Sequence, residues 1–212
     1  MSQSGPTFGA PGEEKEPMLL LDTTGSMNYP AEATSPTKRR EVIQEAIKLI
    51  VAELAKEDSQ AAHEEEGGGL RTITFAGGEA YDIEDLNPDN LHQKWSQIRW
   101  AGGTYIMPGL QKLLEVYKEE FGSRPPNERP TLMALVITDG EAEDTNEFAR
   151  AISQVGGSMY VALAIVGFGD EHDRALRAYQ QIEAQNKHVK TISFGSETDP
   201  QTIARALLRM IE

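Results

Sequence analysis

The sequence predicts an α/β fold, in which a doubly wound, mostly parallel sheet carries helices on both faces and one short antiparallel strand at its edge. Short apolar runs alternate with amphipathic segments along the chain, which is the order of strands and crossover helices in a parallel sheet. The apolar runs are continuous, as in strands that are buried on both faces. A Gly-Gly turn after the second run indicates a tight hairpin and therefore the antiparallel strand.

Five apolar runs are the expected buried strands. The turn at Gly77 and Gly78 then makes residues 79–83 a short antiparallel edge strand. Each of the other strands is followed by a polar or helical segment, so the sheet needs right-handed crossovers between parallel neighbours. The five runs are residues 18–21, 70–75, 132–138, 160–166 and 189–194.

Helices are expected between these strands. Apolar residues from Val42 to Leu54 recur at spacings of three and four, which predicts a long helix that begins near Ser35 and Pro36. This helix should end before the acidic and glycine-rich loop of residues 56–69. The later helices have start signals at Asp144 with Glu147 (capping-box spacing), Asp170 with Asp173, and Asp199 with Pro200.

The composition predicts one domain, residues 17–212, after a mobile tail of residues 1–16 that is rich in Gly, Pro, Ser and Glu. The formal net charge of -14 disfavours nucleic acid and anionic membrane as partners, because both attract basic surfaces. The chain has no Cys, no signal peptide pattern and no apolar stretch long enough to cross a bilayer. We therefore expect an intracellular protein, cytoplasmic by default, with the nucleus left open.

Oxygen-bearing side chains follow two of the expected buried strands. Asp22, Thr24 and Ser26 come directly after the first strand, and Asp139 follows the strand of residues 132–138. If these strands are neighbours where the strand order reverses, the two carboxylates meet in one cleft. Carboxylate and hydroxyl oxygens are hard ligands that suit Mg²⁺, Mn²⁺ or Ca²⁺. The alternative is a plain polar turn, and we favour the metal site because both segments end predicted strands.

Together with Thr104 in a Gly-Gly-Thr loop, these residues resemble the metal-ion-dependent adhesion site (MIDAS) of von Willebrand factor A domains. The resemblance extends from Pro17 to Glu212, with its three segments in the family's order. It implies that the Ser26 and Thr104 hydroxyls bind the ion directly, and that Asp22 and Asp139 bind it directly or through water. Thr24 is a departure, since many members have Ser there. Mg²⁺ is the ion that the resemblance favours, with Mn²⁺ or Ca²⁺ as alternatives.

An ion held largely by hydroxyls keeps most of its charge and should accept a carboxylate from outside. We therefore expect a divalent-cation-dependent protein-binding module whose partner supplies an Asp or Glu, with no catalytic turnover. One alternative is a haloacid dehalogenase-type phosphohydrolase with Asp22 as nucleophile, but this chemistry needs a second Asp as general acid where the chain has Thr24. Another is a structural subunit of a larger assembly, which the retention of all five polar positions disfavours.

Two neighbouring groups of residues are assigned structural roles. Lys38, Arg39 and Arg40 are expected to form a solvated face, with the binding of an acidic partner segment as the alternative. The aromatic and apolar residues that flank the threonine loop are expected to pack beneath it, with a rim that grips the partner as the alternative. These residues are Trp95, Trp100, Tyr105 and Met107.

Overall fold

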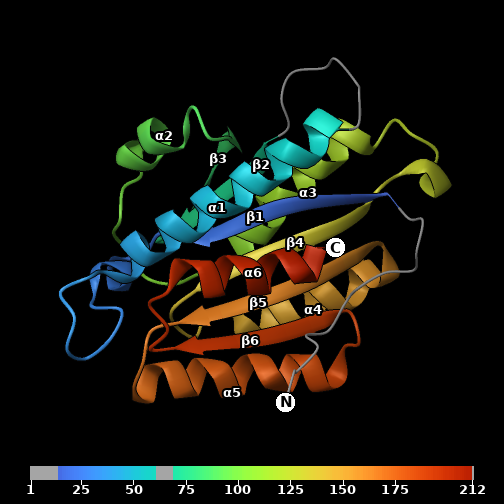
Figure 1. Cartoon of the computed structure of the whole chain (residues 1–212). Coiled ribbons are helices and arrows are strands. Elements are labelled where there is room, and N and C mark those ends of the chain that lie inside the picture. Colours follow the sequence, from blue (N-terminus) through green and yellow to red (C-terminus); the bar gives the residue numbers. More distant parts are fainter. Residues whose placement is uncertain (1–13, 61–68, 212) are drawn as a thin grey trace, which may run out of the picture.

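Six strands form one sheet in the order β3-β2-β1-β4-β5-β6 (Figure 1). The structure is a computed structural model that describes residues 14–60 and 69–211. All neighbouring strands are parallel except β2 and β3, which form the antiparallel hairpin at the edge. The predicted fold class is therefore confirmed. The strands are β1 (Lys15–Asp22), β2 (Leu70–Ala76), β3 (Glu79–Leu86), β4 (Thr131–Thr138), β5 (Met159–Val166) and β6 (Val189–Gly195).

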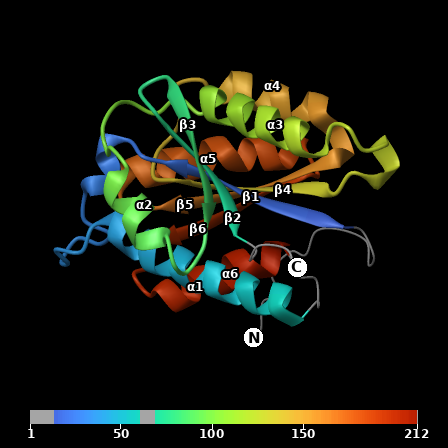
Figure 2. The ribbon, with the colours of Figure 1, turned by 90° about the horizontal axis from the view of Figure 1, so that it is seen from above.

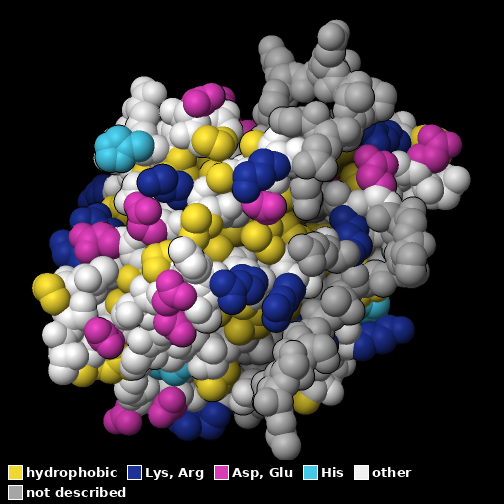
Figure 3. All heavy atoms as spheres, in the orientation of Figure 1, with side chains coloured by type: hydrophobic (Ala, Val, Ile, Leu, Met, Phe, Trp, Pro, Cys, Tyr) yellow, Lys and Arg dark blue, Asp and Glu magenta, His cyan; other side chains and the backbone are white. Residues whose placement is uncertain are grey.

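Helices cover both faces of this sheet, as Figure 2 shows from above. One layer consists of α1 and α6, with the short α2 beside them near the β3 edge, and the other consists of α3, α4 and α5. On the outer face of α1 and α6, acidic and basic side chains lie side by side (Figure 3). The helices are α1 (Arg39–Gln60), α2 (Leu91–Gln97), α3 (Met107–Phe121), α4 (Thr145–Val155), α5 (Asp170–Gln185) and α6 (Pro200–Ile211).

The two helical layers enclose two apolar clusters, one on each face of the sheet. Along β1, Leu19 and Leu21 face the cluster under α1 and α6, whereas Met18 and Leu20 face the cluster under α3, α4 and α5. Because side chains alternate between faces, a strand that is buried on both sides must be apolar throughout, which explains the continuous runs in the sequence. No helix in the described part of the chain is long and apolar enough to cross a membrane.

The first helix begins and ends later than the sequence indicated. Residues before α1 are held in a pairing between Pro30 and Lys38, and the Ala31 N–H donates to the Thr37 carbonyl at 2.8 Å. This pairing keeps them out of the helix, so α1 starts at Arg39 rather than near Ser35. At its other end α1 continues to Gln60, into the segment that was expected to be a loop.

Two helices, α2 and α3, were not predicted, and the start of α3 corrects the role of Asp144. The Asp144 carboxylate accepts hydrogen bonds from the Ile106 and Met107 N–H groups, at 2.8 and 2.9 Å. It therefore caps α3, whereas sequence spacing had assigned its side chain to α4. Such a cap from a distant segment leaves no local signal in the sequence.

Strands β1 and β3 also differ from the expected bounds. β1 begins at Lys15, two residues before the expected domain start, because Lys15 and Glu16 pair with Thr131 and Leu132 of β4. β3 extends through Leu86 instead of ending at residue 83. The remainder of the expected tail, residues 1–13, lies outside the described residues.

Candidate functional site

The carboxyl ends of β1 and β4 lie next to each other in the sheet, at the point where the strand order reverses (Figure 1). From β1 the chain adds β2 and β3 on one side, and β4 is followed by β5 and β6 on the other. Asp22 is the last residue of β1, and Asp139 directly follows β4. Ligands of open α/β sheets bind at this kind of position.

Hydrogen bonds join four of the five predicted metal ligands into one network. The Asp22 carboxylate accepts from the Thr24 N–H at 2.8 Å, and the hydroxyls of Thr24 and Ser26 lie 3.1 Å apart. The Ser26 hydroxyl in turn donates to Asp139 Oδ1 at 2.8 Å. The two segments that sequence analysis singled out therefore converge, although Ser26 and Asp139 are separated by 113 positions.

The fifth predicted ligand, Thr104, lies in the loop that adjoins this network. The Gly25 N–H donates to the Gly102 carbonyl at 3.3 Å, and the Thr104 carbonyl accepts from the Glu143 N–H at 2.9 Å. These contacts are made by the backbone, so they place the loop between the segment after β1 and the segment after β4. They therefore fix the position of the Thr104 backbone beside the network.

Close backbone packing explains why position 102, two residues before Thr104, is a glycine. Gly102 has a φ of 101°, and a Cβ at this position would lie 2.9 Å from the Gly77 nitrogen. The Gly77 N–H also donates to the Gly103 carbonyl at 2.8 Å. Only glycine fits here, because both the backbone conformation and the space exclude a side chain.

Burial gives the site an unusual electrostatic character. Asp22 and Asp139 are both buried, and Asp22 Oδ2 accepts a hydrogen bond from the Thr138 hydroxyl at 2.7 Å. Burial, and then the nearby Asp139 carboxylate, raise the pKa of Asp22 to about 7. A positive charge placed between these carboxylates would therefore stabilise the ionised form of Asp22.

Arg39 places a positive charge beside Asp139, which corrects the expectation that residues 38–40 form a solvated face. Its Nη1 lies 2.7 Å from Asp139 Oδ2, and the residue is only 5% exposed. Arg40 remains partly exposed, with its guanidinium carbon 5.5 Å from the centroid of the Trp100 ring. A helical pattern cannot reveal that the first residue of a helix turns inward, so sequence reasoning missed Arg39.

Two further side chains that the sequence did not indicate hold the loop after β4. The Thr138 hydroxyl binds Asp22, as described above. From α5, the buried Tyr179 hydroxyl accepts from the Ala142 N–H at 3.2 Å and donates to the Gly140 carbonyl at 3.3 Å. Tyr179 falls within the apolar stripe of α5, so its pattern indicated only a core residue.

The donor set fits a hard divalent cation. It combines two buried carboxylates with the hydroxyls of Thr24 and Ser26, all oxygen atoms. Within residues 14–60 and 69–211 no group of three or more His, Asp or Glu side chains is arranged to hold a metal. Any ion bound here would consequently depend on hydroxyl oxygens as well as on carboxylates.

The aromatic residues near the threonine loop divide between the two expected roles. Trp95 is buried and packs against Trp100, with ring centroids 5.3 Å apart, as expected of residues beneath the loop. Tyr105 is instead 37% exposed, and its hydroxyl donates to Glu143 at 2.7 Å. Tyr105 and Glu143 therefore form part of the outer surface beside Thr104.

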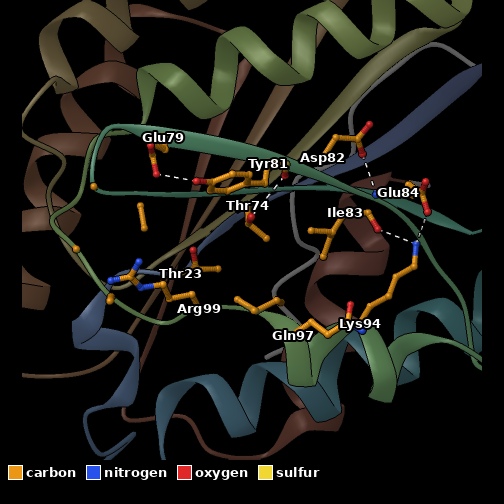
Figure 4. A pocket seen from close by; sticks show the side chains of 15 residues that line it. Thr23, Thr74, Glu79, Tyr81, Asp82, Ile83, Glu84, Lys94, Gln97 and Arg99 are labelled. Carbon is orange, nitrogen blue, oxygen red and sulfur yellow. Dashed lines mark hydrogen bonds and ion pairs between the residues drawn. The ribbon is translucent and has the colours of Figure 1, made fainter.

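A cavity of about 660 Å³ lies between β3 and α2 and borders the site through Thr23 and Gly102. Figure 4 shows Thr23 and Arg99 at one end and Glu84 and Lys94 at the other, with Tyr81 above. The Lys94 ammonium donates to the Ile83 carbonyl at 2.7 Å and to Glu84 at 3.0 Å. The cavity is thus a concave surface that adjoins the site on the side of β3 and α2.

The sequence profile of the von Willebrand factor type A domain matches residues 18–203. The chain belongs to this family. No curated protein matches the chain in a sequence comparison. The assignment therefore agrees with the resemblance carried by Asp22, Thr24, Ser26, Thr104 and Asp139.

Solved structures of von Willebrand factor A domains share this fold. The SpRpn10 VWA domain superposes with a TM-score of 0.61 at 12% identity, over 92% of this chain and 94% of that one. Proximal thread matrix protein 1 from the mussel byssus, with a zinc-occupied MIDAS motif, gives a TM-score of 0.59 at 14% identity, over 92% and 48%. Manganese-loaded Plasmodium vivax TRAP protein gives 0.55 at 15% identity, over 92% and 72%. At these identities the likeness concerns the fold.

Proposed function

We propose that this von Willebrand factor A domain is a protein-binding module that depends on a divalent cation. Asp22, Thr24, Ser26, Thr104 and Asp139 would hold the ion. When bound, the ion would offer a coordination position to an Asp or Glu carboxylate of the partner. The observation that carries the proposal is the hydrogen bond between Ser26 and Asp139 beside Asp22, which joins the ends of two neighbouring strands into one oxygen-rich site.

Mg²⁺ is the ion we propose first, with Mn²⁺ and Ca²⁺ as alternatives. The donor atoms are all oxygen, which suits these ions better than softer metals. The mussel and Plasmodium structures named above contain zinc and manganese, so related domains accept more than one divalent metal.

Hydrogen bonds within the protein orient two of the proposed ligands. Asp22 is oriented by two hydrogen bonds, from the Thr24 N–H and the Thr138 hydroxyl, and Ser26 is oriented by Asp139. Ligands that are already fixed lose little conformational entropy on binding. The exposed Tyr105 and the adjoining cavity give a partner further surface to contact.

The net charge supports a protein partner over nucleic acid or membrane, and we propose the cytoplasm as the place of binding. The net charge of -14 repels polyanions, and cation-mediated binding is a way for an acidic surface to recognise an acidic group. Binding of a carboxylate partner should therefore be lost when the ion is removed by a chelator.

The alternative function as a phosphohydrolase is disfavoured by the residue at position 24. Its general acid would occupy position 24, where the buried Thr24 hydroxyl lies against Ser26. A threonine hydroxyl is too weak an acid to protonate a leaving group near neutral pH. A structural subunit with a vestigial site would retain the fold but bind no ion.

Calorimetric titration of chelator-treated protein with Mg²⁺, Mn²⁺ and Ca²⁺ tests the proposal. Wild type should bind one ion, and Asp22→Ala should bind it at least about tenfold more weakly. Asp199→Ala is the matched control, because Asp199 is an exposed carboxylate at the start of α6, and it should bind like wild type. Equal affinities in wild type and Asp22→Ala would show that the site is wrongly assigned.

Hydrolysis of p-nitrophenyl phosphate tests the enzymatic alternative on the same proteins. No turnover is expected from wild type with any of the three ions. Phosphate release that is abolished by Asp22→Asn would replace the binding module with a phosphohydrolase.

A further inference from the structure

Arg39 lies in a pocket that is built around its guanidinium group. Its Nε donates to the Pro30 carbonyl at 3.3 Å, and its guanidinium carbon lies 5.7 Å from the centroid of the Tyr29 ring and 6.0 Å from that of Phe168. Gly167 closes the pocket from the end of β5. It has a φ of 92°, and a Cβ there would lie 2.7 Å from the Arg39 guanidinium carbon.

The position of Arg39 in its helix has no local advantage. It is the first residue of α1, where a positive charge is unfavourable because it opposes the helix dipole. It is also almost completely buried, which is costly for a charge unless a partner compensates. The compensating group is Asp139, so the pocket of Arg39 and the candidate metal site are parts of one arrangement.

The two oxygens of Asp139 are divided between Arg39 and the metal site. Oδ2 accepts from Arg39 Nη1 at 2.7 Å, whereas Oδ1 accepts from the Ser26 hydroxyl at 2.8 Å. Arg39 thus contacts the oxygen that is turned away from Ser26. The guanidinium can remain in place while the other oxygen serves an ion.

Formal charges show what this pairing does. When both are ionised, Asp22 and Asp139 carry two negative charges, and Arg39 beside Asp139 reduces their sum to one negative charge. A divalent cation would then leave one positive charge at the site, whereas without Arg39 it would leave none. A residual positive charge attracts a carboxylate, and a smaller negative charge attracts the cation less.

We propose that Arg39 is a built-in counter-charge of the metal site, which holds Asp139 in position without an ion, weakens cation affinity, and leaves the loaded site positive for a partner carboxylate. This inference rests on the proposed function, since it concerns the same site. It assigns Arg39 as a positioning residue rather than as a ligand.

Substitution of Arg39 separates its charge from its packing. Arg39→Gln removes the charge and retains a hydrogen-bonding side chain. Arg39→Lys retains the charge but loses the planar guanidinium group with its several N–H donors. Arg40→Gln is the matched control, because it removes the same charge from the next residue, which lies over Trp100. Mn²⁺ affinity is measured by calorimetry on chelator-treated proteins.

The expected result is that Arg39→Gln binds Mn²⁺ about tenfold more tightly or better, whereas Arg39→Lys stays within about threefold and Arg40→Gln within about twofold of wild type. A structural defect would weaken ion binding, so tighter binding cannot come from damage to the fold. If Arg39→Gln binds Mn²⁺ no more tightly than wild type, or if Arg39→Lys behaves like Arg39→Gln, the counter-charge role is wrong.

The outcome also distinguishes this inference from the proposed function. If wild type binds Mn²⁺ and Arg39→Gln does not bind it more tightly, the metal site stands and the role of Arg39 falls. If wild type binds no ion but Arg39→Gln does, the proposed function falls and Arg39 stands as the charge that excludes the ion. If neither binds, both are overturned.

Two further measurements complete the test. Acetate is titrated onto the Mn²⁺-loaded proteins and followed by water-proton relaxation; Arg39→Gln should bind it more weakly than wild type, and equal or stronger binding contradicts the role in attracting a carboxylate. If Arg39→Gln is unfolded by circular dichroism in chelator, saturating Mn²⁺ should restore its folded spectrum. A variant that stays unfolded with Mn²⁺ overturns the proposal.

Discussion

Single residues from distant parts of the chain determine the shape of the candidate site. Asp22, Thr24, Ser26 and Asp139 were recognisable in the sequence, because they follow two apolar runs in the order of the metal site of von Willebrand factor A domains. The orientation of their oxygens depends on Thr138 and on Tyr179 from α5, which no local pattern connects to them. Residue types are thus predictable here, whereas their partners are not.

Tyr179→Phe tests how much the Tyr179 hydroxyl contributes to stability and to the position of the loop after β4. Loss of the buried hydroxyl leaves the Ala142 N–H without its acceptor and should reduce the free energy of unfolding by about 1–2 kcal/mol. The loop after β4 should loosen, so Mn²⁺ affinity should fall severalfold. Urea unfolding and calorimetry measure the two effects.

Tyr81→Phe is the matched control for this substitution. Its hydroxyl is exposed and donates to the exposed Glu79, so its removal should change stability by less than about 0.5 kcal/mol. Equal effects of the two substitutions would show that the Tyr179 hydroxyl does not hold the loop.

At the scale of elements, the sheet was more predictable than the helices. All six strands were recognised, because burial on both faces imposes continuous apolar runs and the Gly77-Gly78 turn imposes a hairpin. α3 was missed although its apolar residues have helical spacing, since Pro108 and Gly109 near its start resemble a loop. Its cap, Asp144, comes from the segment after β4. A start that is fixed by tertiary structure is not encoded in neighbouring residues.

Asp144→Ala should therefore affect α3 before it affects α4. We expect a loss of about 1–2 kcal/mol of stability and faster hydrogen exchange at the Ile106 and Met107 amides. Exchange measured by NMR on the variant and on Asp144→Asn, which retains one acceptor, checks this. Unchanged exchange at both amides, together with faster exchange in the first turn of α4, would restore the assignment made from sequence spacing.

At the scale of the whole molecule, β1 carries a carboxyl group near each end, fully buried at Asp22 and partly buried at Glu16. Asp22 lies at the site, and Glu16 lies near the opposite end of the strand, close to Glu120, Asp85 and Glu14. Burial, followed by repulsion from these carboxylates, raises the pKa of Glu16 to about 7. The folded state therefore binds the Glu16 proton more tightly than the unfolded state, and Glu16 contributes most to stability when it is protonated.

The contribution of Glu16 should be fully present below about pH 4.5 and lost as the pH rises through about 7. Glu16→Gln should accordingly stabilise the protein by about 1–2 kcal/mol at pH 8.5 and change it little at pH 4.5. Urea unfolding in chelator at the two pH values measures this difference. Glu128→Gln, which alters an exposed carboxylate, should show no such pH dependence, and a gain for Glu16→Gln that is the same at both pH values would contradict the raised pKa.

The register between β1 and β4 has a consequence for how the chain refolds. Leu21 pairs with Ile137 across more than half of the sequence, and this pairing brings together the segments that carry Ser26 and Asp139. Local hairpins and helices can form earlier, but loop closure over such a distance is slow. If the proposed site binds Mn²⁺, this paramagnetic ion should therefore bind during refolding only after β1 has paired with β4, and the time at which it binds should report when that pairing forms.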